Sequence, residues 1–268
     1  MSDPTGGYRD FDFAVEFYDY QLWSQMMGDI DFYVDLARSL GDSALELASG
    51  TGRVLLPIAR AGISVTGLDL SDPMLSRCRE KLAEEPPEVQ QRVTLVHGDM
   101  RRFDLGRTFP LVFIAFRSFQ ALLTTEDQMA CLSCAHRHLQ PEGRFVLNLF
   151  NPWLELLVNQ AEDEEFGEMP PMTLPDGRRV VTRQRSYNRD FFRQTFEADI
   201  IHRVTHPDGR TERLVQSFPM RWLYRFEAEH LLYRCGFEVL SVYADFKKRE
   251  VGSINPGELI FVCRPAVR

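Results

Sequence analysis

The chain lacks the long apolar runs, the basic excess and the paired cysteines that define several large protein classes. None of its 268 residues falls in an apolar run that approaches the roughly 18 residues of a membrane span. It has 31 Lys and Arg against 39 Asp and Glu, a net charge of −8, which argues against binding nucleic acid or an anionic membrane with the whole surface. Its five cysteines are odd in number, which disfavours a disulfide framework. Residues 1–7 also lack the basic start of a signal peptide, so we expect a cytoplasmic protein.

From residue 43, short apolar runs alternate with amphipathic stretches. This alternation predicts an α/β fold with a parallel sheet covered by helices on both faces. The expected strands are 43–47, 63–68, 93–96, 111–116 and 144–150, and the expected helices between them are 54–61, 72–84 and 126–139. A turn is expected at 140–143, before the last of these strands. The alternation resumes with a helix at 227–235 and strands at 237–242 and 259–263.

Residues 151–225 interrupt this alternation. Acidic residues and prolines at 160–177 predict a solvated loop, and 178–225 alternates polar and apolar residues with a period of two. The sequence His206-Pro207-Asp208-Gly209 predicts a turn between two antiparallel strands. We therefore expect an N-terminal helical cap at 1–40, a core made of 41–150 and 226–268, and an antiparallel β insert at 151–225. The insert is expected to act as a lid, as a contact between copies of the chain in a homo-oligomer, or as both.

The most informative segment is the glycine turn E-L-A-S-G-T-G-R at 46–53, between the first strand and the first helix. Gly50 and Gly52 allow the backbone to turn tightly and to approach a ligand without a Cβ clash. The helix that follows offers unpaired N–H groups at its start. Asp69 follows the second strand and Asp99 the third, and the carboxyl ends of neighbouring parallel strands line one crevice. The turn and both carboxylates are therefore expected in one site, where one acid can accept the two hydroxyls of a ribose and another an exocyclic amine.

These segments resemble the motifs of class I S-adenosylmethionine-dependent methyltransferases. The turn is similar to the family's acidic-x-Gly-x-Gly-x-Gly motif, with Ala48 in the first glycine position. Residues 67–75 are similar to the motif whose acidic residue holds the ribose, and 98–100 to the motif that contacts the adenine. Residues 139–145 are similar to the family's turn into the fifth strand. The resemblance covers 43–150 and fits more loosely through 226–266.

The resemblance implies a Rossmann-like seven-stranded sheet whose last strand is antiparallel, and S-adenosyl-L-methionine as the cofactor. The residues that it places against the cofactor are Tyr18, Glu46, Ala48, Gly50, Gly52, Asp69, Leu70, Met74, Asp99 and Met100. The cap and the insert resemble, in position and character, those of small-molecule methyltransferases, including amino-sugar and glycine N-methyltransferases, so we expect a small-molecule acceptor. In such enzymes an aromatic segment closes over the cofactor, and Tyr18, followed by Trp23, is the candidate here. The alternative, in which Tyr18 only buries the cap helix, stays open.

Methyl transfer from a sulfonium is an in-line displacement with an activated leaving group. The protein therefore needs chiefly to position the nucleophile, and needs a base only if the nucleophile arrives protonated. No dedicated catalytic signature is visible, and Asn-Pro-Pro-aromatic is absent after the fourth strand. Arg117 and Gln120 stand there instead and are expected to face the crevice as positioning residues, Arg117 as a clamp for a carboxylate or phosphate or else as a surface salt bridge. The atom that is methylated, N, O, C or S, cannot be read from the sequence.

Four other interpretations of the sequence are possible. The spacing Cys131-x-x-Cys134-x-His136-x-His138 lies in one helical pattern, whereas structural zinc sites draw ligands from separated loops, so no metal is expected. Arginines and aromatics at 178–193 suggest single-stranded nucleic acid, but strand alternation explains them as a solvated face. An NAD(P)-dependent oxidoreductase is disfavoured because Leu55 occupies the third glycine position of its fingerprint. A methyltransferase fold kept as a binding or assembly module without catalysis is disfavoured by the intact motifs.

Overall fold

The computed structural model describes residues 12–20, 28–159, 161 and 164–266, and it divides the chain into two compact units. The core unit consists of Gly28–Pro152 and Trp222–Arg268, and the insert unit of Met1–Met27 and Trp153–Arg221. The segment 1–40 is shared between them. Helix α1 (Asp12–Tyr18) belongs to the insert unit, whereas α3 (Asp29–Leu40) belongs to the core unit. Within the described residues, no helix has the length and apolar character needed to cross a membrane.

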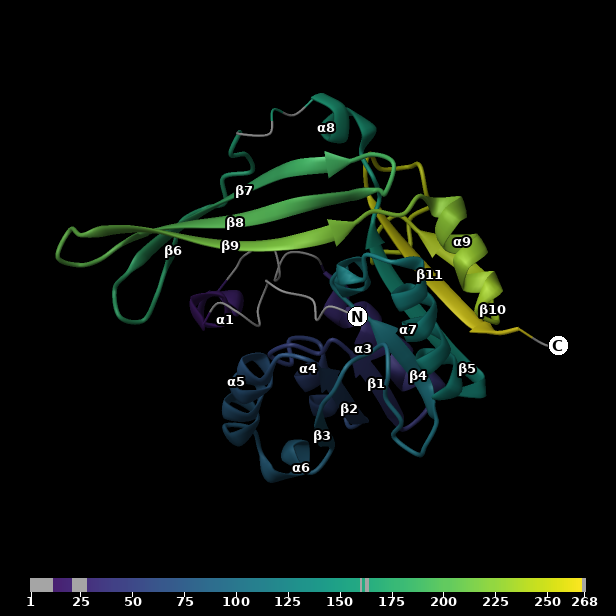
Figure 1. The fold of residues 1–268 in the computed structure, drawn as a ribbon. Helices are drawn as coiled ribbons and strands as arrows, with labels where there is room; N and C mark the ends of the chain where they lie inside the picture. The colour runs from purple at the N-terminus through teal and green to yellow at the C-terminus, as the bar shows by residue number, and fades with distance from the viewer. Residues whose placement is uncertain (1–11, 21–27, 160, 162–163, 267–268) are drawn as a thin grey trace. The chain divides into compact units, whose positions relative to one another are not determined.

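The core unit is built on a seven-stranded sheet (Figure 1). In spatial order its strands are β3 (Val93–His97), β2 (Ser64–Asp69), β1 (Ser43–Leu47), β4 (Phe109–Ile114), β5 (Leu139–Phe150), β11 (Glu258–Pro265) and β10 (Phe237–Tyr243). Strands β1 to β5 pair in parallel, whereas β11 is antiparallel to both of its neighbours. This confirms the predicted methyltransferase-type sheet with an antiparallel last strand.

Both faces of the core sheet are covered because its strands are apolar on both sides. Strands β1 and β4 are buried along their whole length. On one face, residues such as Leu45 and Val112 pack in a cluster with α7 (Thr125–Arg137) and α9 (Arg225–Arg234). On the other face, Tyr33 of α3 stacks on Phe113 of β4, with ring centroids 4.6 Å apart. The remaining core helices are α4 (Leu55–Arg60), α5 (Asp72–Ala83), the short α6 (Pro87–Gln90) and the 3-10 helix η2 (Ser118–Ala121).

Several strand boundaries differ from the predicted ones, and two of these differences are informative. Strand β4 ends at Ile114 instead of residue 116, because Phe116 and Arg117 both adopt left-handed backbone and turn the chain away. Strand β5 begins at Leu139, and the predicted turn 140–143 lies inside it as an irregularity in the pairing with β4. An apolar residue such as Phe116 continues the strand pattern in the sequence, so the pattern alone does not reveal where the backbone leaves the sheet.

The insert unit carries a four-stranded antiparallel sheet, which confirms the predicted antiparallel insert (Figure 1). Its strands, in order, are β6 (Met172–Thr173), β7 (Arg179–Asp190), β8 (Thr195–Thr205) and β9 (Thr211–Arg221). The predicted turn at 206–209 joins β8 to β9, and Gly209 provides its positive φ of 86°. Helix α8 (Leu154–Asn159) precedes the sheet, and β6 lies inside the predicted loop at 160–177.

Helix α1 packs on the insert sheet. Phe17 forms a buried cluster with Leu174, Val180 and Val204. The ring of Phe17 also meets His202 of β8 edge-on, with centroids 5.1 Å apart. The N-terminal helix and a sheet more than 150 residues later in the chain therefore share one small core.

Candidate active site

The turn between β1 and α4 is held in a conformation that favours glycine. Ala48, Gly50 and Gly52 adopt positive φ angles of 58°, 55° and 77°. A Cβ on Gly52 would lie 2.6 Å from Sγ of Cys78, so a side chain there is excluded by contact as well as by backbone angle. Ala48 adopts the same left-handed region with a side chain, which costs roughly 1–2 kcal/mol. The three positions of the predicted motif therefore share one backbone requirement.

The glycine turn lies directly on β2. A Cβ on Gly67 of β2 would lie 2.3 Å from Cδ1 of Leu55 and 2.7 Å from Oγ of Ser49. Only glycine at this position lets the turn and the start of α4 approach the strand. The backbone N–H of Ser49 also donates to the carbonyl of Leu68, at 3.1 Å. The close approach brings the turn next to the carboxyl end of β2.

Asp69, at the end of β2, is joined to the glycine turn. Its Oδ2 accepts from the N–H of Gly50 at 2.7 Å, and its Oδ1 accepts from the N–H of Ser71 at 2.8 Å. Burial raises the pKa of Asp69 above its usual value, although these hydrogen bonds favour the ionised form and act in the opposite direction. Each carboxylate oxygen has a second lone pair, so Asp69 can still accept two hydroxyl groups. The predicted neighbourhood of Asp69 and Gly50 is thus present.

Two other predicted residues lie close to Asp69. Met74 is buried, and its methyl carbon lies 3.3 Å from where a Cβ on Gly50 would stand, so it supports the turn. The carbonyl oxygen of Leu70 lies 2.9 Å from Nε2 of His97. Leu70 lies in the segment that connects β2 to α5 (Asp72–Ala83), and Met74 lies in the first turn of α5. Ser71 caps that helix by accepting from the N–H of Met74.

Asp99, which follows β3, is bound by arginine side chains, whereas Asp69 is bound by backbone N–H groups. Both of its oxygens accept hydrogen bonds from Arg101, including one of 2.7 Å from Nη2, and Arg102 contributes a further ion pair at 3.5 Å. Burial raises its pKa, but these interactions outweigh burial and the pKa lies below the usual value. The side chain of Met100 packs against the core cluster. The acceptor positions of Asp99 are therefore already used by its own chain.

Glu46 of β1 is a buried acid, and one of its carboxyl oxygens lacks a hydrogen-bond donor among the described residues. It is 3% exposed, and its Oε2 has no hydrogen-bond partner among the described residues. Burial raises its pKa well above the usual value, with Asp29 and Asp69 acting in the same direction and Arg53 opposing. Burial therefore disfavours the charged form of Glu46, and a positively charged ligand nearby would favour it.

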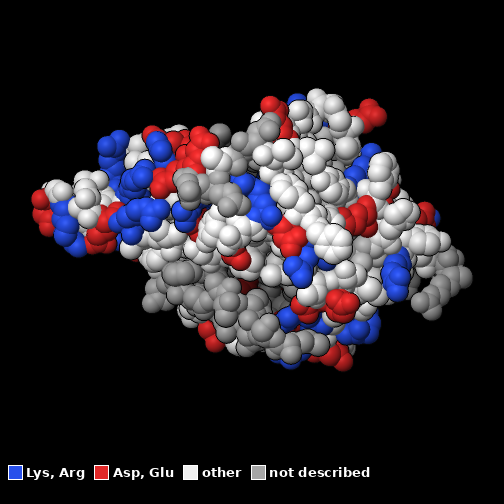
Figure 2. All heavy atoms as spheres, turned by 45° about the horizontal axis from the view of Figure 1, so that its top comes forward, with Lys and Arg blue, Asp and Glu red and all other residues white. Residues whose placement is uncertain are grey.

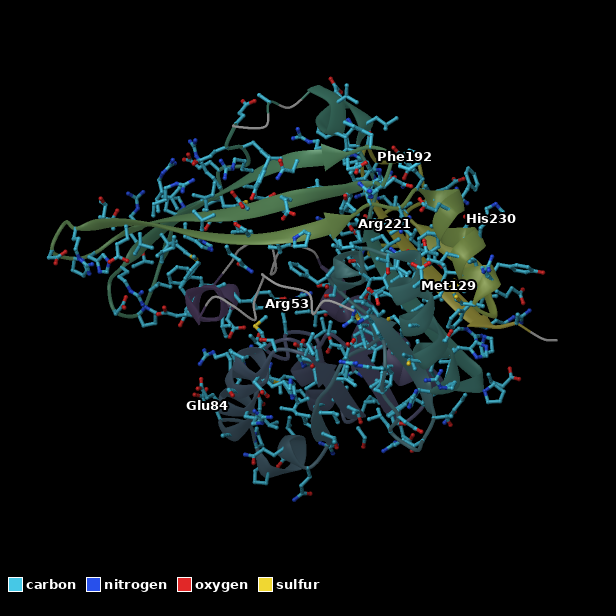
Figure 3. All side chains as sticks on the ribbon, in the orientation of Figure 1. Arg53, Glu84, Met129, Phe192, Arg221 and His230 are labelled. Carbon is cyan, nitrogen blue, oxygen red and sulfur yellow. The ribbon has the colours of Figure 1, made fainter. Side chains whose placement is uncertain are left out.

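Arg53 and Asp29 form a buried ion pair that the sequence did not reveal. Arg53, labelled in Figure 3, donates from Nη1 and Nη2 to the two oxygens of Asp29 at 2.7 and 2.6 Å. The side chains are 11% and 1% exposed. The guanidinium also lies 5.0 Å from the centroid of the Phe116 ring. The pair ties the start of α3 to the glycine turn, and an acid at a helix start together with an arginine in the motif was the only available signal.

Tyr33 is a second residue that sequence reasoning missed. Its side chain is fully buried, and its hydroxyl has no hydrogen-bond partner in the described part of the chain. Burial raises the pKa of Tyr33, and the charges of Asp29, Glu46 and Glu258 raise it further. The hydroxyl therefore lies within electrostatic reach of carboxylates from three separate elements.

Arg117 and Gln120 follow β4, as predicted, but each has a partner in its own chain. Arg117 pairs with Glu258 of β11 through two contacts, one of them 3.2 Å between Nε and Oε2. Asn148 of β5 donates to the same Oε2 at 3.0 Å. Gln120 is fully buried, and its Oε1 accepts from the N–H of Phe150 at 2.9 Å, so it holds the end of β5.

Of the two predicted aromatic contacts, Tyr18 is among the described residues. Tyr18 is in α1 of the insert unit, where it is buried with 7% exposure. Trp23 lies outside the described residues. A cofactor contact by Tyr18 stays a prediction.

The arginines of the insert are largely paired with acids. Figure 2 shows basic and acidic groups interleaved over the insert sheet. The pairs are Arg178 with Glu16 and Asp176, Arg183 with Glu168, Arg185 with Asp199, Arg193 with Asp190, and Arg203 and Arg213 with Glu165. The acidic run thus neutralises part of the basic surface, which counts against a nucleic-acid groove.

Cys131 and Cys134 of α7 are buried, and His138, which follows the helix, bonds to backbone. Nε2 of His138 accepts from the N–H of Leu105 at 2.9 Å, and its Nδ1 lies 2.8 Å from the carbonyl oxygen of Cys134. Both ring nitrogens are therefore engaged by backbone. Within the described ranges, no group of three or more His, Cys, Asp or Glu side chains could hold a metal ion.

Comparison with known proteins agrees with this geometry. Residues 44–143 match the family model described as a methyltransferase domain. The chain is 37% identical over 197 residues to dTDP-3-amino-3,6-dideoxy-alpha-D-glucopyranose N,N-dimethyltransferase of Streptomyces fradiae, covering 74% of this chain and 70% of that protein.

Two solved structures are also similar. The CcbJ methyltransferase of Streptomyces caelestis has a TM-score of 0.77 and 27% identity, covering 99% of this chain and 100% of that one. The glycopeptide N-methyltransferase MtfA, solved with S-adenosyl-L-methionine, has a TM-score of 0.56 and 28% identity, covering 89% and 94%. With the glycine turn joined to Asp69 on a sheet of this topology, these matches show that the chain belongs to the class I S-adenosylmethionine-dependent methyltransferases.

Proposed function

We propose that the chain transfers a methyl group from S-adenosyl-L-methionine to an amine nitrogen of a small molecule. The observation that carries the proposal is the excess of carboxylates around the glycine turn. Among the described residues, the acids Asp29, Glu46 and Asp69 lie at or beside the turn against the cations Arg53 and Lys81. Farther along the sheet, Glu258 pairs with Arg117. Negative charge at the reacting centre favours a positively charged cofactor and an amine as the methylated group. The S. fradiae relative and the glycopeptide enzyme are both named as N-methyltransferases, which supports the same acceptor class.

The residues of the turn suit the cofactor. We propose that the backbone at Ala48, Gly50 and Gly52 approaches it, that Asp69 accepts the ribose hydroxyls through its remaining lone pairs, and that Glu46 faces its positive charge. Leu70 and Met74 would border the same position. Asp99 and Met100 would border the adenine, and Asp99 would then have to share its oxygens with Arg101. Tyr18 is proposed as a further contact from the insert unit.

When bound, the cofactor supplies a methyl group on a sulfonium, which is already activated for displacement. The protein's contribution is to hold the acceptor nitrogen in line and to exclude water, and well-oriented reactants can gain roughly 7 kcal/mol or more in this way. Arg117 and Gln120 are proposed as positioning residues. Arg117 is bound to Glu258, so it is a poor clamp for an acceptor carboxylate, whereas Gln120 supports the end of β5.

The insert unit is proposed to serve as a lid, as a contact between copies of the chain, or as both. The packing of α1 on the insert sheet supports this, because the helix and the sheet form one body that could move or dock as a whole. The domain roles of the sequence prediction, cap and insert against core, therefore stay proposals.

Isothermal titration and a methylation assay test the proposal. We expect the protein to bind S-adenosylhomocysteine and not NADH. With S-adenosyl-L-methionine, we expect a dTDP-linked 3-amino-3,6-dideoxyglucose to gain methyl groups by mass spectrometry, and the matching 3-hydroxy sugar to gain none. Failure to bind S-adenosylhomocysteine would favour an assembly module. Methylation of the hydroxy sugar but not the amine would refute the amine assignment.

A further inference from the structure

A row of polar side chains crosses the face of the core sheet that α3 covers. In the register of the sheet, Glu46 lies opposite Phe113, and Phe113 lies opposite Val146. Alternate residues of a strand share a face, so Asn148 of β5 points to this same face. Asn148 lies opposite Ile260, and Glu258 is two residues before it, so Glu258 also shares the face. Tyr33 stacks on Phe113 of β4. Glu46 is on β1, the neighbour of β4 on one side, whereas Asn148 and Glu258 are on β5 and β11 on the other side.

Two acceptor atoms in this row lack a donor. The side chains of Asn148 and Tyr33 are fully buried. Asn148 donates its amide N–H to Glu258, which leaves its Oδ1 without a partner among the described residues, and the hydroxyl of Tyr33 is in the same state. Buried polar atoms are nearly always hydrogen-bonded, because leaving them unpaired is unfavourable. Two such atoms beside a carboxylate therefore point to a ligand rich in donors.

Arg117 is held over Glu258 by unusual backbone. Phe116 and Arg117 adopt positive φ angles of 55° and 63° in succession, immediately after β4. Non-glycine residues in this region are uncommon, and they are typically found where function requires a particular placement. The guanidinium side chain remains 37% exposed, whereas Glu258 is 14% exposed. Arg117 thus covers a mostly buried carboxylate from the solvent side.

We propose that Glu258 binds the amino group of the methyl acceptor, and that Arg117 is the cation that occupies Glu258 when no acceptor is bound. This inference rests on the proposed N-methylation. An ammonium entering over Glu258 replaces the guanidinium, and its other N–H groups are accepted by Oδ1 of Asn148 and by the hydroxyl of Tyr33. No covalent bond forms or breaks in this step. Glu258, Asn148 and Tyr33 are then the residues that select an amine. Arg117 competes with the amine for Glu258 and so lowers the apparent affinity for the amine.

The experiment uses methylammonium as the probe and thermal unfolding of the full chain as the readout, with and without S-adenosylhomocysteine. Methylammonium chloride is compared with sodium chloride and tetramethylammonium chloride at equal ionic strength. We expect methylammonium alone to raise the melting temperature, by about 2–4 °C at ten times its dissociation constant. Tetramethylammonium has the charge but no N–H group, so it should behave like sodium.

Variants locate the effect. Glu258→Gln should abolish the rise, whereas Glu238→Gln should retain it. Glu238 pairs with Arg264 on the neighbouring strands β10 and β11, and both side chains are 44% exposed, which makes this pair a matched control. Arg117→Met removes the competing cation and should shift the half-maximal methylammonium concentration downward, by about ten-fold for the loss of one charge-assisted contact. This variant tests the site even if Glu258→Gln is poorly folded.

Two results would overturn the site. One is a wild-type protein that responds equally to sodium and methylammonium, and the other is an Arg117→Met variant with unchanged methylammonium dependence. Titration of the same samples with S-adenosylhomocysteine tests the methyltransferase function separately from the Glu258 site. Cofactor binding without a methylammonium effect leaves the methyltransferase assignment in place and removes the Glu258 site. A methylammonium effect without cofactor binding would support the Glu258 site and contradict the proposed methyl transfer.

Discussion

The core unit holds two groups of site residues that are organised in opposite ways. In the first, the glycine turn at 46–53 and Asp69, backbone N–H groups 19 and 2 residues from Asp69 satisfy its carboxylate. In the second, here called the α3-covered row and made of Tyr33, Asn148 and Glu258 with Arg117, the pairs join residues 141 and 110 positions apart. The first group is thus built by local backbone geometry, and the second by distant side chains that only the finished sheet brings together.

The two groups also differ in what they leave unsatisfied. Around Asp69, backbone donors meet both oxygens, and the remaining lone pairs suit neutral hydroxyls. In the α3-covered row, arginine charge compensates Glu258, and two buried acceptors have no donor in the described residues. A site that binds the same cofactor in every turnover can be completed by backbone, whereas one that selects an acceptor depends on side chains that can vary. Mutation of Asp69 in the first group should therefore change the affinity for S-adenosylhomocysteine, whereas mutations in the second should change the response to methylammonium.

The largest expected effect is on the ion pair that joins α3 to the glycine turn. Asp29→Asn leaves the charge of Arg53 buried without its partner, and breaking a buried pair in this way costs about 3–5 kcal/mol. Urea unfolding of the variant should show this loss in the free energy of unfolding. Tyr33 of the α3-covered row is on the same helix, so binding of methylammonium should weaken along with stability.

The matched control is the ion pair of Arg60, the last residue of α4, with Glu85. Arg60 is 56% exposed and Glu85 is 11% exposed, and a pair whose cation faces solvent in this way contributes about 1 kcal/mol or less. Glu85→Gln should therefore change the free energy of unfolding by no more than that. Equal losses in the two variants would mean that the Asp29 pair is not structurally distinct.

The sequence predicted the first group well because its requirements are local. Gly50, Gly52 and Gly67 are needed where backbone approaches backbone, and their spacing is visible in a single short window. The parallel sheet also followed from strand and helix alternation, and its antiparallel last strand from the family resemblance. The antiparallel insert could also be predicted, because alternation of polar and apolar residues and one turn sequence are enough to indicate adjacent antiparallel strands.

The second group could not be predicted for the opposite reason. Glu258 and Asn148 are ordinary polar residues in strand segments, and their meeting depends on β11 returning antiparallel beside β5. Arg117 was predicted to face the crevice, but nothing in the sequence near it announces Glu258. Tyr33 falls in a helix whose pattern only indicates burial. The division of 1–40 between two units was also hidden, because aromatics bury a helix equally well against either partner.

Cofactor affinity should separate Asp69 from Asp99. Asp69→Ala removes the acceptor that contacts the glycine turn, and the loss of a charged hydrogen-bond acceptor should weaken binding of S-adenosylhomocysteine by about 1–3 kcal/mol. Asp99→Asn should have a smaller effect on affinity, because Arg101 already engages both of its oxygens. Isothermal titration measures both. Equal losses would show that Asp99 contacts the cofactor as directly as Asp69 does.

The pH dependence of stability tests Glu46. Burial raises its pKa in the folded state above the unfolded value of about 4.3. The folded protein therefore holds more protons than the unfolded one between these two pKa values, so the contribution of Glu46 to stability falls as pH rises through that interval. Glu46→Gln does not titrate and removes this term. The variant should gain stability relative to the wild type from pH 4.5 upward, measured by urea unfolding at a series of pH values, and a constant difference would contradict the burial of an ionisable group.

The smallest effect, and the most specific to the glycine turn, is expected at Ala48. Its left-handed backbone costs a side-chain-bearing residue roughly 1–2 kcal/mol, and glycine avoids that cost but loses about 0.4–1 kcal/mol through the greater freedom of the unfolded chain. Ala48→Gly should therefore raise the free energy of unfolding by up to about 1 kcal/mol without changing affinity for S-adenosylhomocysteine. Gly50→Ala places a side chain in the same backbone region and should lower stability by a similar amount. A loss of stability in Ala48→Gly would mean that the alanine methyl makes packing contacts worth more than the backbone strain, and the first motif position would then differ in kind from the two glycines that follow it.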